Sequence, residues 1–290
     1  MKATIVNAIR LLAATILYFI CFVVISGALL SSASTQPGPE EAGSTLLALL
    51  AVSFINTTVL AYIILRSRWS GWKLIAGLAL VFFGVNTLMP QIETAVFVTR
   101  LPPGMLPRLF LAGAIIAAVF VPLAVAIFGK ARSQKDEMPA RPRLNMSASV
   151  WIGKLAFIAV AYVIIYFTFG YFIAWQSAAV RAYYGDGELR GFIAHITSEL
   201  RNNPLLFVLQ AVRGLLWAAL AVPIMSMMKG KWWEAGLAVA LLFGVLMNSQ
   251  LLLPNPLMPP EVRMAHLLET ATSNFLFGWL VVVTLLSSRQ

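Results

Sequence analysis

Long apolar stretches alternate with short polar ones along the whole chain, and each apolar stretch runs for about 20 residues or more. A hydrocarbon core of about 30 Å is crossed by a helix of about 20 apolar residues. The stretches do not alternate between apolar and polar residues with a period of two, as the strands of a transmembrane barrel do. The pattern therefore predicts eight membrane-spanning helices, at about 8–30, 44–65, 72–90, 108–129, 151–176, 205–228, 232–252 and 262–287.

The turns that follow the second and the sixth predicted helix resemble each other. Both are short, basic and rich in tryptophan, and the residues after them align when the chain is shifted by 159 positions. Ala-Gly-Leu-Ala at 76–79 recurs at 235–238, and with one residue of slippage Phe-Gly-Val at 83–85 recurs at 243–245. We therefore expect two copies of a four-helix unit. Because each copy has an even number of spans, both start on the same side and the repeats are parallel.

The predicted fold is an all-α integral membrane protein of two parallel four-helix repeats. Residues 1–130 form the first repeat, 131–149 a basic cytoplasmic linker, and 150–290 the second repeat. Within the second repeat, residues 188–201 place apolar residues at helical spacing between charged ones. This pattern predicts a short amphipathic helix on the outer membrane surface. The first repeat has no counterpart, and this helix is a candidate docking site for a protein partner.

Composition excludes a soluble fold. The 290 residues are 60% hydrophobic and 11% charged, with a mean hydropathy of +0.85, whereas soluble domains are about 45–50% apolar and about 25% charged. The single cysteine, Cys21, lies inside the first apolar stretch, so the chain forms no intramolecular disulfide.

The net charge of +10 alone would favour nucleic acid, but the charges separate by side of the membrane. With the amino terminus inside, the inner flanks hold fourteen basic residues, including all seven lysines, against three acidic ones; the outer side holds seven arginines against eight acidic residues. This positive-inside asymmetry predicts a multi-pass protein of the plasma (inner) membrane with both termini cytoplasmic. Membrane lipids, and not nucleic acid, are the expected partners. The basic linker is either a topology signal or a contact with anionic headgroups.

The first third of the last predicted helix carries the candidate chemistry. His266, Glu269, Thr272 and Ser273 fall three or four residues apart and so share one face of the helix. A carboxylate at that depth costs several kcal/mol unless another group compensates its charge. Glu269 is therefore a functional-site hypothesis by default.

Arg213, in the sixth predicted helix, is the candidate partner of Glu269. Arg213 lies nine residues beyond Pro204, and Glu269 lies nine beyond Pro260, so each is about 13 Å along its helix from the outer end. We expect the two charges to face each other inside the second repeat, in an outward-facing polar pocket. The side chains expected nearby are those of His266, Gln210 and Asn274.

Glu93, at the outer end of the third predicted helix, is a further candidate, although a residue just past Pro90 can also lie in water. A buried ion pair has two interpretations, a ligand pocket or a structural pair that pins two helices. The polar face that continues through Thr272 and Ser273 favours the pocket, because a pair alone has no need of further polar groups.

No motif identifies a metal, a cofactor or a reaction. Two histidines, one cysteine and scattered carboxylates lack ligand spacings such as HExxH or CxxC, and haem between His195 and His266 is a minor alternative. GxSxG is absent, and the adjacent glutamates Glu40 and Glu41 lack the following arginine of intramembrane CAAX-type proteases. We expect neither metal nor cofactor.

Three functions fit these features. The first is binding or translocation of a small molecule or lipid, with Arg213 as anion or counter-ion partner and Glu269 as a group that responds to protons or cations. The second is an enzyme that acts on a lipid-linked substrate from the outer face, with Glu269 or His266 as general acid or base. The third is a non-catalytic subunit whose outer helix docks a partner.

Overall fold

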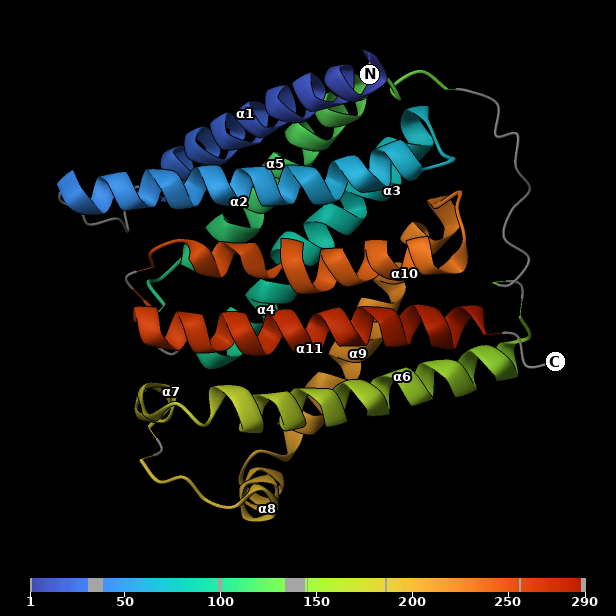
Figure 1. Ribbon diagram of the computed structural model, residues 1–290. Helices are drawn as coiled ribbons and strands as arrows, with labels where there is room; N and C mark the ends of the chain where they lie inside the picture. Colours follow the sequence, from blue (N-terminus) through green and yellow to red (C-terminus); the bar gives the residue numbers. More distant parts are fainter. Residues whose placement is uncertain are drawn as a thin grey trace.

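Among the residues that the structure describes, eight helices are long and apolar enough to cross a membrane, as the hydrophobic pattern predicts. Figure 1 shows them in a computed structural model. The structure describes residues 2–30, 39–98, 101–133, 144, 146–185, 187–255 and 257–287. In these ranges the chain forms helices and connecting turns, with one isolated β-bridge between two turns. The central part of the predicted linker 131–149 lies outside the described residues.

The spans are built from both single and composite helices. In chain order they are α1 (Lys2–Leu30), α2 (Pro39–Arg66), α3 (Gly71–Phe83) continued by the π-helix η2 (Gly84–Leu88) and α4 (Met89–Phe97), α5 (Met105–Ile127), α6 (Ala148–Phe169) continued by the π-helix η4 (Gly170–Ala174), α9 (Pro204–Met227), α10 (Trp232–Ala240) continued by the π-helix η5 (Leu241–Leu246) and the 3₁₀-helix η6 (Asn248–Leu252), and α11 (Pro260–Leu286). Two short helices, α7 (Ala178–Tyr183) and α8 (Phe192–Asn202), lie between the fifth and sixth spans.

The third span is longer than predicted because its helix does not stop at Pro90. Proline has no N–H for the carbonyl four residues earlier, which here belongs to Asn86 inside η2. Gln250 of η6 supplies a donor to this carbonyl, because its Nε2 lies 2.8 Å from the Asn86 carbonyl oxygen and 2.9 Å from Asn86 Oδ1. The span then continues as α4, which carries Glu93.

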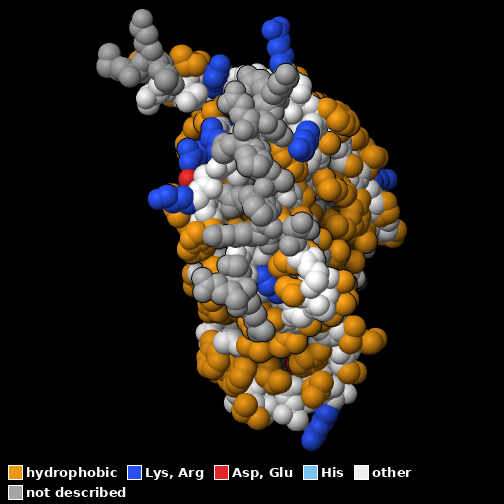
Figure 2. All heavy atoms as spheres, turned by 90° about the vertical axis from the view of Figure 1, so that its right-hand side faces the viewer, with side chains coloured by type: hydrophobic (Ala, Val, Ile, Leu, Met, Phe, Trp, Pro, Cys, Tyr) orange, Lys and Arg blue, Asp and Glu red, His pale blue; other side chains and the backbone are white. Residues whose placement is uncertain are grey.

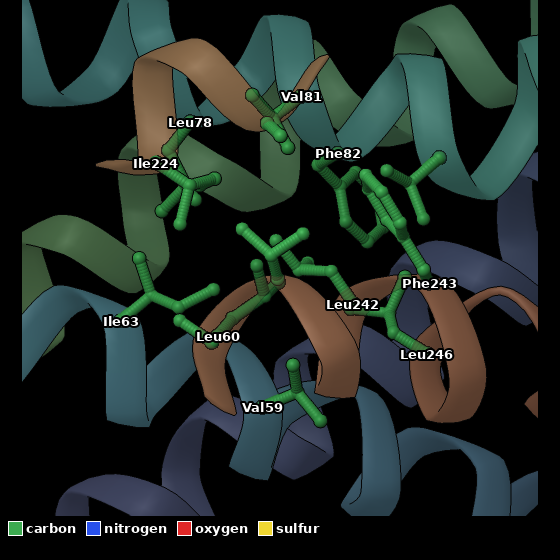
Figure 3. Close-up of a cluster of buried hydrophobic side chains, with 14 of the residues drawn as sticks. Val59, Leu60, Ile63, Leu78, Val81, Phe82, Ile224, Leu242, Phe243 and Leu246 are labelled. Atoms are coloured by element: carbon green, nitrogen blue, oxygen red, sulfur yellow. The ribbon is translucent and has the colours of Figure 1, made fainter. Parts of the chain in front are cut away.

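Neighbouring spans pack in the same order in the two halves of the chain. α1 lies against α2 and α5, and α3 lies against α5; likewise α6 lies against α9 and α11, and α10 lies against α11. Between the halves, α3 contacts α9 and α2 contacts η5. Figure 3 shows the shared core at this junction, with Leu60 of α2, Phe82 of α3 and Phe243 of η5. The two halves therefore form one packed body.

The turns after the second and the sixth span meet at one end of the molecule, here called the basic end. The Arg68 amide donates to the Met227 carbonyl at 2.8 Å, and the Lys229 amide donates to the Arg66 carbonyl at 3.1 Å. The Arg66 guanidinium pairs with Glu234 of α10. The start of α1 and the finish of α11 lie at this end in Figure 1. The end-on view in Figure 2 shows lysine and arginine side chains around it.

Helix α8 lies below α6 in Figure 1, left of the centre and so away from the basic end. It is seen nearly end-on, which shows that its axis crosses the direction of the spans. It covers residues 192–202, where the sequence predicts a helix at about 188–201. None of its side chains is fully buried. The Tyr171 hydroxyl donates to the Arg190 carbonyl at 2.6 Å and so ties the segment before α8 to η4.

Candidate functional site

A cavity of about 730 Å³ lies at the end opposite the basic end. Its wall comes from both halves of the chain, with α4 and α5 on one side and η4, α7, α8, η6 and α11 on the other. The sequence predicts a pocket inside the second repeat, whereas this cavity lies between the halves. The difference arises because the third span continues past Pro90 and brings Gln91 and Glu93 to the wall.

The last span, α11, presents His266 and Glu269 to the cavity. Pro260, at the first helical position, leaves no N–H there to be satisfied. Three residues apart on one face, the two side chains meet, with Nδ1 of His266 2.8 Å from Oε2 of Glu269. Nε2 of His266 lies 3.1 Å from the hydroxyl of Tyr184, just past α7. Tyr184, His266 and Glu269 thus form a continuous hydrogen-bonded chain in the cavity wall.

This chain can hold or release one proton. Burial raises the pKa of Tyr184, so its hydroxyl keeps its proton at neutral pH and can donate it in a hydrogen bond. The neutral tautomer of His266 that satisfies both neighbours carries its proton on Nδ1, donates to Glu269 and accepts from Tyr184. A second proton on the imidazole would cancel the charge of the Glu269 carboxylate. The cluster therefore has two charge states that differ by one proton.

Arg213 pairs with Glu93 and not with Glu269, which corrects the pairing expected from the sequence. Its Nη2 lies 2.5 Å from Oε1 of Glu93, and its Nη1 donates to Oε1 of Gln210 at 2.8 Å. Within the described ranges, the ion pairs at the cavity are Arg213 with Glu93 and Glu269 with His266. The Arg213 side chain is only 1% exposed and does not line the cavity, so it acts from behind the wall.

The expected pairing rested on equal depth along two helices. Depth does not determine which neighbour a side chain faces, and α9 packs against α3 of the first half as well as against α6. Arg213 therefore meets a carboxylate from the first half. Glu93 is available to it because the third span continues past Pro90 as a helix.

Gln210 and Asn274 are buried and lie outside the cavity wall. Gln210 has no exposed surface and accepts the hydrogen bond from Arg213. Asn274 is 4% exposed, and its amide donates to the sulfur of Met247, which does line the cavity, at 3.4 Å. Asn274 thus contacts a wall residue from behind, whereas Gln210 contacts Arg213, which itself lies behind the wall.

Thr272 and Ser273 also lie outside the wall. Ser273 is buried and donates to the Thr270 carbonyl at 3.4 Å, whereas Thr272 is exposed and donates to a carbonyl of its own helix at 2.7 Å. At about 100° per residue, Thr272 points about 120° away from His266, because two successive steps of three residues rotate in the same sense. Thr270 lines the cavity instead, with its hydroxyl 2.6 Å from Oδ1 of Asn248.

Several other wall residues were not predicted from the sequence to belong to the site. Tyr184 and Trp175 belong to a stretch whose pattern is that of an interfacial aromatic belt, and the pattern does not distinguish lipid-facing rings from cavity-facing ones. His195, expected on a surface helix, lines the cavity with its ring centroid 5.0 Å from that of Trp175. Asn248 and Gln250 also line it, and their polarity within an apolar span was the signal that could have identified them.

The donor groups that the structure describes bear on the metal and haem alternatives. Among the residues that the structure describes, no three His, Cys, Asp or Glu side chains come together as a metal site. Both nitrogens of His266 are engaged by Tyr184 and Glu269, so this histidine has no nitrogen to offer to haem iron.

Comparisons with known proteins add no family to this picture. The chain matches no protein-family model, and no curated protein and no solved structure matches it. The cavity and its charged groups are therefore the basis for a functional assignment.

Proposed function

We propose that this protein binds a small molecule or lipid in the cavity and carries it across the membrane. The observation that supports this function is a space of about 730 Å³ beside charged groups within the spans. Charged side chains are costly in a membrane, and a pair that only pinned helices would need no space beside it. A concave, largely apolar site with a few converging polar groups is typical of ligand pockets.

A carrier role also draws support from the likeness of the two halves, which we propose are parallel four-helix repeats. The aligned glycines Gly84 and Gly244 both lie in π-helices, and the spans pack in the same order in each half. In many carriers the ligand binds between two repeats, and one repeat moves against the other. The position of the cavity between the halves fits this mechanism.

The proposed orientation places the basic end in the cytoplasm and the cavity on the outer side of the plasma (inner) membrane. A cysteine that replaces Glu261, which is exposed near the cavity end, should react with a membrane-impermeant maleimide on intact cells in a Cys21→Ala background. A cysteine at Lys231, exposed at the basic end, should react only after permeabilisation. The reverse labelling pattern would refute this orientation.

Gly170 provides the test of the binding function. A Cβ at this position would lie 3.6 Å from Oε1 of Glu269, an ordinary contact, so a larger side chain would extend into the cavity. Gly153, in α6 of the same span, has nothing within 4 Å of such a Cβ. Gly170→Leu should therefore obstruct the site beside Glu269, and Gly153→Leu is the matched control.

The measurement is mass spectrometry of small molecules and lipids that co-purify with each variant. A species enriched in wild type and Gly153→Leu and at least about tenfold depleted in Gly170→Leu would be the ligand, and its movement is then followed in proteoliposomes. Identical co-purified species in all three proteins, each correctly folded, would contradict the proposed function.

An enzyme on a lipid-linked substrate is the second candidate, and the Tyr184, His266 and Glu269 chain favours it. A carboxylate that orients an imidazole, which in turn contacts a hydroxyl, can move a proton to or from a bound substrate. Turnover by purified protein in detergent, without any gradient, would support the enzyme over the carrier. Loss of that turnover in Glu269→Gln would assign the proton-transfer role to the hydrogen-bonded chain of Tyr184, His266 and Glu269.

A non-catalytic subunit that docks a partner through α8 is the third. Ile193 and Leu200 of this helix are 74% and 53% exposed, and we propose that they contact membrane lipids or a protein partner. A partner that co-purifies with wild type and Glu269→Gln but is lost in Ile193→Glu would support a subunit role.

A further inference from the structure

The charge of the cavity wall is opposite to that of the chain as a whole. The protein has 21 basic and 11 acidic residues, yet none of the described residues that line the cavity is lysine or arginine. The ionisable wall residues other than tyrosine are Glu93, Glu199, Glu269, His195 and His266. A low-dielectric cleft lined by one sign of charge concentrates molecules of the opposite sign.

Three arginines of the described ranges lie close behind the wall, and each has a partner there. Arg181 and Arg263 donate to the backbone carbonyls of Trp175 and Leu253, which are wall residues. The guanidinium of Arg213 lies behind Glu93, and its Nη2 is bound to Oε1 of that residue. The second carboxylate, Glu269, is 6% exposed, and its described ion-pair partner is His266, which carries charge only when doubly protonated. With His266 neutral, the inner wall therefore keeps the negative charge of Glu269.

An anion would meet two obstacles at this site. The guanidinium that could receive it is 1% exposed and occupied by Glu93, so the anion would have to displace that carboxylate. The displaced Glu93 and the nearby Glu269 would then both repel the anion in a region that water screens weakly. The geometry therefore does not favour Arg213 as the binding group for an anionic ligand.

Aromatic rings cover much of the remaining wall. The rings of Trp175 and Tyr184 are stacked with centroids 6.2 Å apart, and Phe97 meets Tyr184 edge-on at 6.3 Å. Ring faces attract ammonium and other organic cations. The same contact occurs one layer deeper, where the guanidinium of Arg213 lies 5.6 Å from the ring centroid of Tyr162.

Apolar residues complete the wall and exclude a small hydrated ion as the natural occupant. Leu101, Met105 and Leu109 from the first half face the cavity together with Leu206 and Met258 from the second. Such a surface stabilises an apolar body by removing it from water. The wall therefore combines a part with carboxylates and aromatic rings and a part with aliphatic side chains. Together these parts suit a molecule with one positive group and an apolar body beside it.

We propose that the cavity selects an amphiphilic organic cation, with Glu269 as its counter-ion and the aromatic rings of Phe97, Trp175 and Tyr184 around its charge. This inference rests on the proposed binding function and specifies the class of ligand. The cation contacts the wall from the cavity side, while the pair of Arg213 with Glu93 stays intact behind it.

Two probes of nearly equal size and shape and opposite charge, tetraphenylphosphonium and tetraphenylborate, test the inference. Saturable binding of each radiolabelled ion is measured on purified full-length protein in a neutral detergent at pH 8. We expect the phosphonium to bind at least about tenfold more tightly than the borate. Glu269→Gln, whose amide oxygen can still accept from His266, should weaken phosphonium binding at least about tenfold. Glu261→Gln, on the exposed part of the same helix and outside the wall, should bind as wild type does.

Folding of each variant is checked by size-exclusion chromatography. If Glu269→Gln does not yield monodisperse protein, Glu199→Gln at the α8 edge of the cavity replaces it, with an expected loss of about threefold because Glu199 is less buried. Unchanged phosphonium binding in the folded variant overturns the inference. So does the absence of saturable phosphonium binding to wild type.

The outcomes separate the ligand class from the binding function itself. If the borate binds as tightly as the phosphonium and Gly170→Leu abolishes both, the cavity binds ligands without selecting cations, and only this inference fails. If neither ion binds and no co-purified species depends on Gly170, the binding function fails with it.

Discussion

Two of the ion pairs among the described residues join the halves of this chain, one near each end of the spans, and their surroundings differ. At the basic end, Arg66 of the first half pairs with Glu234 of the second, and the Arg66 side chain is 42% exposed. At the cavity end, Arg213 of the second half pairs with Glu93 of the first, and the Arg213 side chain is 1% exposed. The first pair lies beside backbone hydrogen bonds that already join the halves. The second lies beside a cavity.

This difference suggests different roles for the two pairs. The Arg66 and Glu234 pair only joins the halves, whereas the Arg213 and Glu93 pair is also part of the candidate site. Water screens an exposed pair, so its contribution to stability is small. A desolvated pair is costly to break, because the charge that remains has no partner. The Glu93 side chain is 29% exposed and lines the cavity while its partner is sealed behind the wall. The cavity end is thus where the stability of the fold and the proposed ligand site involve the same charges.

Removal of Arg213 should produce the largest effect on stability. Arg213→Leu leaves Glu93 without its partner, and we expect the free energy of unfolding to fall by about 3 kcal/mol, the lower end of the range for a buried pair, because the Glu93 side chain is 29% exposed. The measurement is reversible unfolding in mixed micelles, followed by circular dichroism. Arg213→Leu combined with Glu93→Leu removes both charges and should recover most of the loss. A double variant no more stable than the single one would show that packing, and not charge, accounts for the effect.

More of the fold than of the candidate site could be predicted from the sequence. In hydrocarbon only helices and closed barrels satisfy their backbone hydrogen bonds. The long apolar stretches without period-two alternation therefore predict the eight spans from local pattern alone. The end of the third span did not follow, because Pro90 is a usual stop. The amide that satisfies the freed carbonyl of Asn86 comes from Gln250, 164 positions along the chain. A contact at that distance leaves no trace in local periodicity.

The same distinction applies to the site. His266 and Glu269 are three residues apart on one helix, so their proximity was predictable. The pairing of Arg213 with Glu93 joins the two halves of the chain. From the sequence, only the depth of Arg213 along its helix could be predicted, and not the carboxylate that it faces. Thr272 was misplaced for a third reason, because steps of three residues accumulate rotation away from the first residue.

The second prediction concerns the amide that lets the third span reach the cavity. Gln250→Leu removes two hydrogen bonds to Asn86 and should lower the free energy of unfolding by about 1–3 kcal/mol. Pro90→Ala restores a backbone N–H four residues after Asn86, so Gln250→Leu should cost less in that background. Equal costs in both backgrounds, measured by the same unfolding assay, would rule out this account of the long third span.

The third prediction is that the pH dependence of phosphonium binding comes from a histidine at the cavity end. Both histidines of the chain line the cavity, and the groups that face His266 are Tyr184, Glu269 and, further away, Glu93. Protonation of His266 adds a positive charge beside Glu269, so cation binding should weaken as pH falls. We expect phosphonium affinity to drop about tenfold between pH 8 and pH 5.

His266→Gln should make phosphonium binding nearly independent of pH over this range, because an amide does not titrate. His195→Gln, the matched control in the same wall, should keep the wild-type profile, since Glu269 pairs with His266, whereas the His195 ring packs against the rings of Tyr171 and Trp175. If His195→Gln removed the pH dependence and His266→Gln kept it, the proton would act at α8 and not at the Tyr184, His266 and Glu269 chain.

The smallest effect is expected at the basic end, where Arg66→Gln removes the charge that pairs with Glu234. The Arg66 side chain is 42% exposed, and Glu234, whose side chain is only 8% exposed, keeps its hydrogen bond from the Lys231 amide. The loss in the free energy of unfolding should therefore stay below about 1 kcal/mol and shrink further in high salt. The hydrogen bonds from Lys229 to the Arg66 carbonyl and from Arg68 to the Met227 carbonyl involve backbone atoms and survive the substitution. Phosphonium binding should be unchanged. A loss as large as that of Arg213→Leu would mean that the halves are held together chiefly at the basic end, and the contrast between the two pairs would then disappear.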